Sequence, residues 1–163
     1  MQKKQLNISY QVYQSKDELP AEWASLLQRA TEATERSYAP YSNFNVGAAI
    51  LLDNGEVVCG SNQENAAYPS GLCAERSACY YAGAAFPGAR MLAIAVAARQ
   101  DGKLTETPTY PCGACRQALV QYENRGGVPM TVIVGSATRI EVFDSVKDLL
   151  PFAFDNLDES VMI

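Results

Sequence analysis

The chain has 163 residues, a formal net charge of −5, and 48% apolar residues. A chain of this length can bury one ordinary core, so we expect a single globular domain over residues 1–163. The negative charge argues against binding to nucleic acid and favours a small, neutral substrate. We find no stretch that is apolar for long enough to be a signal peptide or to span a membrane, so we expect a cytoplasmic protein.

The first 20 residues form an N-terminal extension in which the run NISYQVY alternates apolar and polar residues, as a strand does. A helix is predicted after Pro20, because proline is favoured at the first helical position and the apolar residues then recur at helical spacing. Its predicted apolar face consists of Trp23, Leu26, Leu27 and Ala30.

The middle of the chain predicts a hairpin and then two helices that alternate with buried strands. Asn54-Gly55 joins the runs VGAAILLD and EVVCGS and is a strong hairpin signal. Helices are expected to begin near Cys73, running to about Ala82, and near Pro111. The runs MLAIAVAA and VPMTVIVG are almost continuously apolar, which is typical of strands that are buried on both faces.

The end of the chain predicts a further strand, RIEVF, and a short helix, SVKDLL, with Ser145 as its cap. Only the short stretch GSATR separates the last two strands, so we expect them to be antiparallel, because a parallel crossover needs about a dozen residues. The whole pattern predicts an α/β fold. We expect a three-layer α-β-α sandwich around a mixed five-stranded sheet, with room for an extra N-terminal strand.

The chain has five cysteines and no histidine. An odd number of cysteines that includes a CxxC motif favours a reducing compartment in which thiols serve as ligands. Without histidine, zinc ligation must be all sulfur or sulfur with carboxylate, and Ser-His or Cys-His nucleophiles are excluded. A general base near neutral pH is then expected to be a carboxylate.

Spacing suggests how three of these thiols could hold one zinc ion. Cys112 and Cys115 are three residues apart, on one side of a helical turn. Cys73 and Glu75, two residues apart, can converge only on something beyond a helix N-terminus. We therefore expect one zinc between two helix N-termini, whose dipoles favour thiolates. Arg76 could donate hydrogen bonds to the thiolates or could equally be a surface arginine.

Two other interpretations of the cysteines must be weighed. A lone CxxC often marks a redox pair, and a closed structural zinc site would need Cys59 or Cys79 as its fourth ligand. Cys79 lies about nine ångströms along the helix from Cys73, which is too far to share the ion. Cys59 stands within a strand and is more simply explained as a buried small hydrophobe. An open zinc site beside Glu75 remains the favoured interpretation.

From about Ala30 to Phe154 the chain resembles the cytidine deaminases, specifically the small type that acts on free nucleosides. The resemblance rests on four motifs in order, YAPYSNFNVGAA, NQENAAYPSGLCAERSA, PCGACRQ and LLPFAF. It implies zinc-dependent hydrolytic deamination of cytidine and 2′-deoxycytidine in pyrimidine salvage, by a homotetramer with shared active sites. The chain departs from the family pattern in its N-terminal extension and at Tyr110, where serine is common.

The resemblance implies that one zinc per chain is bound by the three thiols Cys73, Cys112 and Cys115. It also implies that Glu75 shuttles protons. Rival functions are deamination of tRNA, single-stranded DNA or a nucleotide, deamination of a nucleoside antibiotic, and a structural zinc or dithiol redox role. The acidic charge and the short final connection disfavour nucleic acid as the substrate.

The resemblance also implies a set of substrate-binding residues. Phe44 would pack on the pyrimidine, Asn62 and Glu64 would bind the ribose hydroxyls, and Ala74 belongs to the same set. Asn62 and Glu64 are two residues apart, so in an extended segment they face the same way, although a solvated turn would also explain them. Phe44 could instead be a core residue. Phe154 would reach into the pocket of an adjacent subunit.

Overall fold

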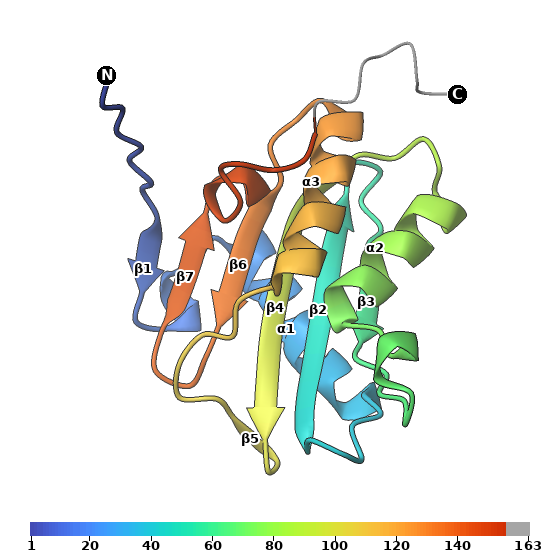
Figure 1. Cartoon of the computed structure of the whole chain (residues 1–163). Coiled ribbons are helices and arrows are strands. Elements are labelled where there is room, and N and C mark those ends of the chain that lie inside the picture. Colours follow the sequence, from blue (N-terminus) through green and yellow to red (C-terminus); the bar gives the residue numbers. More distant parts are fainter. Residues whose placement is uncertain (156–163) are drawn as a thin grey trace.

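The sheet and helices of the computed structural model, which describes residues 1–155, are shown in Figure 1. The strands are β1 (Gln11–Tyr13), β2 (Phe44–Leu52), β3 (Val57–Ser61), β4 (Met91–Gln100), β5 (Lys103–Leu104), β6 (Thr131–Gly135) and β7 (Ile140–Phe143). The α-helices are α1 (Ala21–Ala33), α2 (Ala74–Ala85) and α3 (Gly113–Gly126). None of the helices in the described part of the chain has the length and apolar character to cross a membrane.

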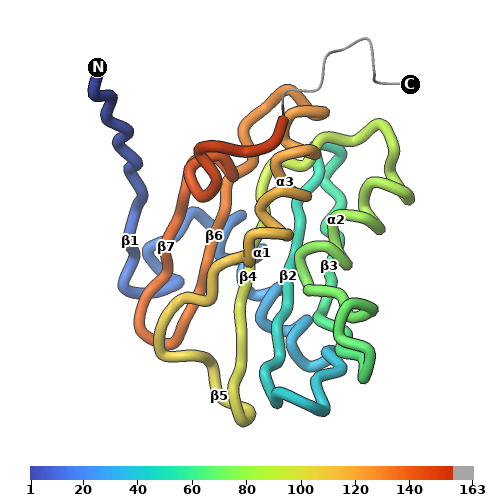
Figure 2. The backbone as a smooth tube through the Cα atoms, in the orientation of Figure 1, coloured from blue at the N-terminus to red at the C-terminus, as the bar shows by residue number. Residues whose placement is uncertain are grey.

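The elements form three layers, as the sequence predicts. The seven-stranded sheet has the order β1-β7-β6-β4-β2-β3, and β5 pairs with β4. Helix α1 covers one face, and α2 with α3 covers the other (Figures 1 and 2). The predicted five strands are all present, and β1 and the two-residue β5 extend the sheet at its margins.

The sheet is mixed. Strands β4 and β6 are parallel, and the other pairs are antiparallel, including β6 with β7. The prediction that the last two strands are antiparallel, made from their short connection, is therefore confirmed. The hairpin between β2 and β3 is also confirmed, and Gly55 has a φ of +86° in its turn, a conformation that suits glycine.

The N-terminal strand is shorter than the alternating pattern NISYQVY predicts. Only Gln11–Tyr13 is a strand, pairing antiparallel with β7. Strand β7 ends at Phe143, opposite Tyr10, so residues 1–9 have no continuing edge with which to pair. They extend away from the sheet instead (Figure 2).

Two helix ends differ slightly from the prediction. Helix α2 continues to Ala85, and the run SVKDLL forms one turn of 3-10 helix at Val146–Asp148. Ser145 caps this turn as expected, because its hydroxyl accepts a hydrogen bond from the Lys147 backbone N–H at 3.0 Å.

Helix α2 packs unusually close to the sheet at Gly60 in β3. A Cβ at this position would lie 2.5 Å from the Ala74 carbonyl oxygen and 2.6 Å from the Ala78 backbone nitrogen. Only glycine permits this approach, which fixes the first turn of α2 against β3.

Candidate metal centre and its pocket

Three thiols meet where helices α2 and α3 begin. Cys73 is the N-cap of α2, Cys112 is the N-cap of α3, and Cys115 follows in the first turn of α3. The Sγ atoms of Cys73 and Cys112 are 3.9 Å apart, and those of Cys112 and Cys115 are 3.6 Å apart. All three sulfur atoms lie within 4.8 Å of one another.

These distances fit a tetrahedral zinc ion. Zinc–sulfur bonds of about 2.3 Å at tetrahedral angles separate two sulfur ligands by about 3.8 Å. Within residues 1–155 no fourth cysteine, aspartate or glutamate joins the group. Three protein ligands and a position for water or substrate are the pattern of catalytic zinc sites.

The local backbone explains why both helices present a thiol. Cys73 and Cys112 are extended, with φ and ψ of −71° and 154°, and of −67° and 167°. Their carbonyl oxygens accept the first hydrogen bonds of the two helices, from the backbone N–H groups of Ser77 and Arg116, both at 2.9 Å. Each N-cap thiol therefore lies at a helix N-terminus, where the helix dipole favours a thiolate.

Arg76 contributes the positive charge of the site. Its Nη2 donates to the Cys73 sulfur at 3.6 Å, as the spacing of the two residues allows. A hydrogen bond from Cys115 and the Arg76 guanidinium together lower the pKa of Cys73 to about 5. Sharing its proton with Cys73, and burial, raise the pKa of Cys115. Nε of Arg76 is buried and has no hydrogen-bond partner within the described residues.

Glu75 is the carboxylate of the site. It lies in the first turn of α2 and is 4% exposed. Burial raises the pKa of its carboxyl group, and a hydrogen bond from its own backbone N–H opposes that shift. A buried carboxyl group in the same helical turn as the Cys73 thiol is placed to take up and return a proton.

The other two cysteines lie outside the cluster. Cys79 is buried, and its thiol donates to the Arg76 carbonyl oxygen at 3.7 Å. Cys59 is only half-buried, less than the sequence suggested, and packs at the edge of the core between α1 and the sheet. Both positions agree with excluding these residues as zinc ligands.

A pocket of about 460 Å³ opens beside Cys73, one of the three thiols. Cys73 and Arg76 line it, together with the segment 62–65. Its size suits a small molecule of the dimensions of a nucleoside.

Asn62 and Glu64 both line this pocket, as does Gln63 between them. The Asn62 amide donates to the Phe44 carbonyl oxygen at 2.9 Å and accepts from the Val46 backbone N–H at 2.7 Å, so it prolongs the β2–β3 pairing. Its oxygen and its NH₂ group each retain capacity for one further hydrogen bond.

Glu64 is held in the pocket as an anion. Its carboxylate accepts hydrogen bonds from the Ser42 hydroxyl and from the backbone N–H groups of Tyr41 and Ser42, at 2.9 and 3.3 Å. The Ser42 hydrogen bond and then those of the backbone lower the pKa of Glu64.

The other three predicted substrate-binding residues are not among the residues that line this pocket. Phe44 begins β2, is half-buried, and is not among the residues that line the pocket. Ala74 is fully buried as the first residue of α2. Phe154 is 72% exposed, away from the pocket of its own chain.

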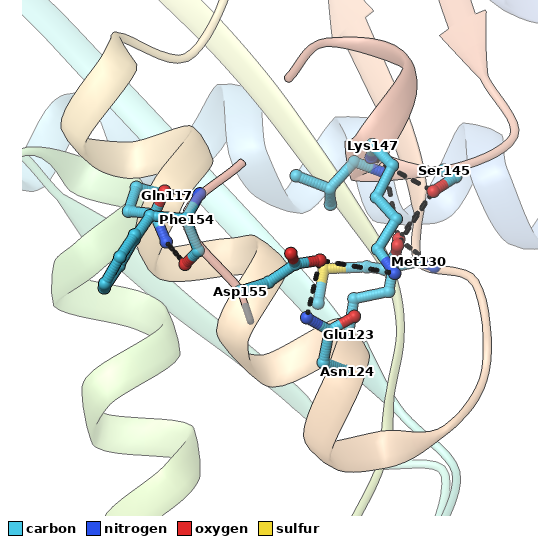
Figure 3. Close-up of polar contacts among 9 residues, drawn as sticks. Gln117, Glu123, Asn124, Met130, Ser145, Lys147, Phe154 and Asp155 are labelled. Atoms are coloured by element: carbon cyan, nitrogen blue, oxygen red, sulfur yellow. Dashed lines mark hydrogen bonds and ion pairs between the residues drawn. The ribbon is translucent and has the colours of Figure 1, made fainter. Parts of the chain in front are cut away.

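The sequence did not single out Gln117, which holds the backbone of Phe154. Nε2 of Gln117 donates to the Phe154 carbonyl oxygen at 2.8 Å, and the Phe154 backbone N–H donates to Oε1 at 3.1 Å (Figure 3). The two residues are far apart in the chain, so no local pattern signals the contact.

A second missed feature is a buried carboxylate near Cys112. Glu141 in β7 is 4% exposed; it accepts from the Tyr110 hydroxyl and from Arg139 Nε at 2.7 Å. A charged residue inside the apolar strand RIEVF was the signal that could have identified it.

Comparison with known proteins agrees with this geometry. Residues 21–131 match the family model for the cytidine and deoxycytidylate deaminase zinc-binding region. A cytidine deaminase of Sporosarcina psychrophila is 40% identical over 138 residues, covering 83% of this chain and 93% of that protein. A cytidine deaminase of Mycobacterium tuberculosis strain H37Rv is 39% identical over 133 residues, covering 82% and 90%.

Solved structures give the same result. The crystal structure of cytidine deaminase from Burkholderia pseudomallei has a TM-score of 0.68 and 40% identity, covering 83% of this chain and 100% of that chain. The structure of cytidine deaminase from Mycobacterium tuberculosis has a TM-score of 0.66 and 35% identity, covering 83% and 99%.

Proposed function

The chain belongs to the cytidine and deoxycytidylate deaminase family, and from this premise we propose that it hydrolyses cytidine and 2′-deoxycytidine to the corresponding uridines and ammonia. As a member of this family it is a zinc-dependent aminohydrolase. The observation that carries the proposal is the convergence of three thiols at two helix N-termini, beside one buried carboxyl group. Pyrimidine salvage is the role that fits a free nucleoside as substrate.

Cys73, Cys112 and Cys115 would hold one zinc ion per chain. When bound, zinc lowers the pKa of a coordinated water towards about 7, which supplies a nucleophile at neutral pH. The charge of three thiolates weakens that effect, and the hydrogen bond from Arg76 to Cys73 offsets part of it. Ligand thiols stay reduced in the cytoplasm, which is the compartment we propose.

Glu75 would move the protons of the reaction. Its carboxylate accepts a proton from the attacking water and delivers it to N3 of the pyrimidine, which makes C4 more electrophilic. It then takes a second proton from the new hydroxyl on C4, which becomes the carbonyl, and passes it to the leaving amine as ammonia departs, so the side chain ends each cycle as it began. The low exposure of Glu75 supports this role, since it excludes bulk water from the proton transfers.

The pocket beside the thiols would bind the nucleoside. Glu64 is fixed as an acceptor by Ser42 and Tyr41, and Asn62 keeps one free donor and one free acceptor position. Such a pair can bind a sugar hydroxyl as donor and as acceptor. Phe44, whose carbonyl oxygen is tied to Asn62, would pack on the base, and Ala74 would border it at the start of α2.

We further propose a homotetramer in which Phe154 completes the pocket of a neighbouring subunit. Phe152 and Phe154 are 90% and 72% exposed, and large exposed aromatic side chains mark interaction surfaces. The net charge of −5 supports a free nucleoside rather than nucleic acid as the substrate.

The test is a spectrophotometric assay of cytidine and 2′-deoxycytidine deamination, with zinc measured on the same protein. We expect one zinc per chain and turnover that a chelator abolishes and added zinc restores. Glu75→Gln should keep its zinc and lose about 10²- to 10⁴-fold in turnover. Glu56→Gln, a change in the exposed hairpin turn, should match the wild type. A zinc-loaded Glu75→Gln protein with full turnover would refute the role of Glu75, and a zinc-free protein would refute the metal site.

A further inference from the structure

We infer that the N-terminal extension holds in place the loop that precedes the metal ligand Cys112. The contact path runs from Tyr10 over Phe143 to Tyr110. The inference rests on the zinc site of the proposed function and adds a positioning role for residues outside the family match, which begins at residue 21.

The first contact joins the extension to β7. The register pairs Gln11 with Val142 and Val12 with Glu141, which places Tyr10 opposite Phe143 on the face that carries α2 and α3. The two rings stack with their centroids 5.0 Å apart and an interplanar angle of 20°. Phe143 is only 6% exposed, whereas Tyr10 is 52% exposed, so Tyr10 forms the outer cover of this ring.

The second contact joins β7 to the metal-site loop. The Phe143 ring meets the Tyr110 ring edge-on, with centroids 6.3 Å apart. The Tyr110 hydroxyl donates to the carboxylate of Glu141, two residues before Phe143 on the same face of β7. The ring and the hydroxyl of Tyr110 are therefore both fixed by one strand.

The buried carboxylate of Glu141 makes this attachment costly to break. Its other observed side-chain partner is Arg139, whose Nε donates at 2.7 Å. A buried carboxylate that loses a donor keeps its desolvation penalty, so the Tyr110 hydroxyl is favoured in its present place. The same loop is also joined to the β6–β7 turn, where Ala137 donates to the Thr105 carbonyl oxygen at 2.9 Å (Figure 1).

The position of Tyr110 is passed on to Cys112 through one rigid residue. Pro111 has a fixed φ, and its carbonyl oxygen accepts from Arg116 Nε at 2.7 Å. The loop therefore has little freedom to absorb a shift of Tyr110 before it reaches the thiol. Cys112 is the exposed ligand, whereas Cys73 is half-buried and Cys115 is buried. Core packing holds Cys112 least, so its place depends most on the loop.

The test measures how fast the zinc-loaded, full-length protein loses its metal to a chelating dye. Tyr10→Ala removes the stack, and Tyr110→Phe keeps the ring but removes the hydroxyl. Because outer partners of zinc ligands typically change metal affinity about 10- to 100-fold, we expect these more distant changes to speed zinc loss by at least about threefold. Tyr10→Phe keeps the stack and should restore the wild-type rate.

Tyr13→Ala is the matched control. Tyr13 lies on the same strand but packs on the opposite face, against the cluster between α1 and the sheet. It should lower the unfolding midpoint without speeding zinc loss. Tyr10 and Tyr110 are proposed to act through the same series of contacts, so breaking it at one point should leave less to lose at the other. The double variant Tyr10→Ala, Tyr110→Phe should therefore increase the rate of zinc loss by less than the product of the two single-variant fold-changes.

The inference is overturned if Tyr10→Ala and Tyr110→Phe lose zinc at the wild-type rate. It is also overturned if Tyr13→Ala speeds zinc loss as much, which would indicate general destabilisation, or if the two effects simply multiply. A wild-type protein that holds no zinc would instead refute the proposed function, so the two failures are distinguishable.

Discussion

The side-chain amide of Gln117 forms two reciprocal hydrogen bonds with the backbone of Phe154, 37 residues further along the chain. Gln117 lies on α3, the helix at whose start Cys112 and Cys115 are found. One helix therefore carries two thiols of the metal cluster and fixes the backbone that presents an exposed aromatic ring (Figure 3).

Gln117→Leu should impair catalysis without removing zinc. The change keeps the size of the side chain and removes both hydrogen bonds, which are worth roughly 1–3 kcal/mol together. If Phe154 completes a neighbouring pocket, its loss of order should raise KM about tenfold or more, a change of about 1.4 kcal/mol. Gln121→Leu, one turn further along α3 at an exposed position, is the control. Unchanged KM in Gln117→Leu would argue against the role proposed for Phe154.

Gly60→Ala should move the start of α2. The new Cβ would lie 2.5 Å from the Ala74 carbonyl oxygen, so the helix that carries Glu75 and follows Cys73 must shift. We expect a loss of about 1–3 kcal/mol in the free energy of unfolding, as for other overpacked sites, together with weaker zinc binding.

Urea unfolding and zinc titration of Gly60→Ala would measure both effects. Gly88→Ala is the matched control, because a Cβ at Gly88 would meet nothing within 4 Å. If Gly60→Ala changed neither the free energy of unfolding nor the zinc affinity, the close packing of α2 on β3 would not be needed for stability or for the metal site.

Much of the fold could be predicted because its signals are local. Asn54-Gly55 identified the hairpin through turn chemistry, and the short GSATR connection excluded a parallel crossover. The spacing of Cys73 and Glu75 anticipated one helix start, since residues two apart can converge only beyond a helix N-terminus, and Pro111 anticipated the other. The alternation in NISYQVY overstated β1, because the length of the partner strand β7 limits the pairing.

The contacts that surround the site could not be predicted, because each joins segments distant in the sequence. Tyr110 and Glu141 are 31 residues apart, and the Asn62 amide pairs with β2 backbone 16 and 18 residues away. Such contacts depend on register and on how the layers pack, which periodicity does not encode. The roles given to Asn62, Glu64, Phe44 and Ala74 remain predictions that substrate binding must test.

Glu123→Gln should destabilise the protein more than most surface changes. The Glu123 carboxylate is 5% exposed and accepts from the backbone N–H groups of Met130 and Val146, both at 2.9 Å, and from the Ser145 hydroxyl (Figure 3). A glutamine keeps both backbone hydrogen bonds only if its NH₂ group faces the Ser145 hydroxyl, and its neutral amide oxygen accepts more weakly than a carboxylate. We expect a loss of about 1–3 kcal/mol in unfolding free energy.

Denaturant unfolding of Glu123→Gln checks this value, and Glu35→Gln at an exposed position is the control. Ser145→Ala, which removes one hydroxyl from the same cluster and the cap of the final turn, should cost about 1 kcal/mol. If Glu123→Gln were no less stable than Glu35→Gln, the carboxylate would not be the link between α3 and the final turn.

Removal of the metal should expose two thiols to a thiol reagent. Zinc holds its ligands as thiolates that cannot attack the reagent, and chelation frees them. Cys112 is exposed and Cys73 is half-buried, so these two should react first, whereas Cys115 and Cys79 are buried and should react slowly. Cys59 is half-buried outside the cluster and should react at the same rate with or without zinc. Thiol titration of the zinc-loaded and of the chelated protein measures how many more thiols react once the metal is removed. Cys59→Ser should lower the number of reactive thiols by the same amount in both states, so the increase on chelation should stay the same. Equal reactivity in the two states would mean that these thiols do not hold the metal.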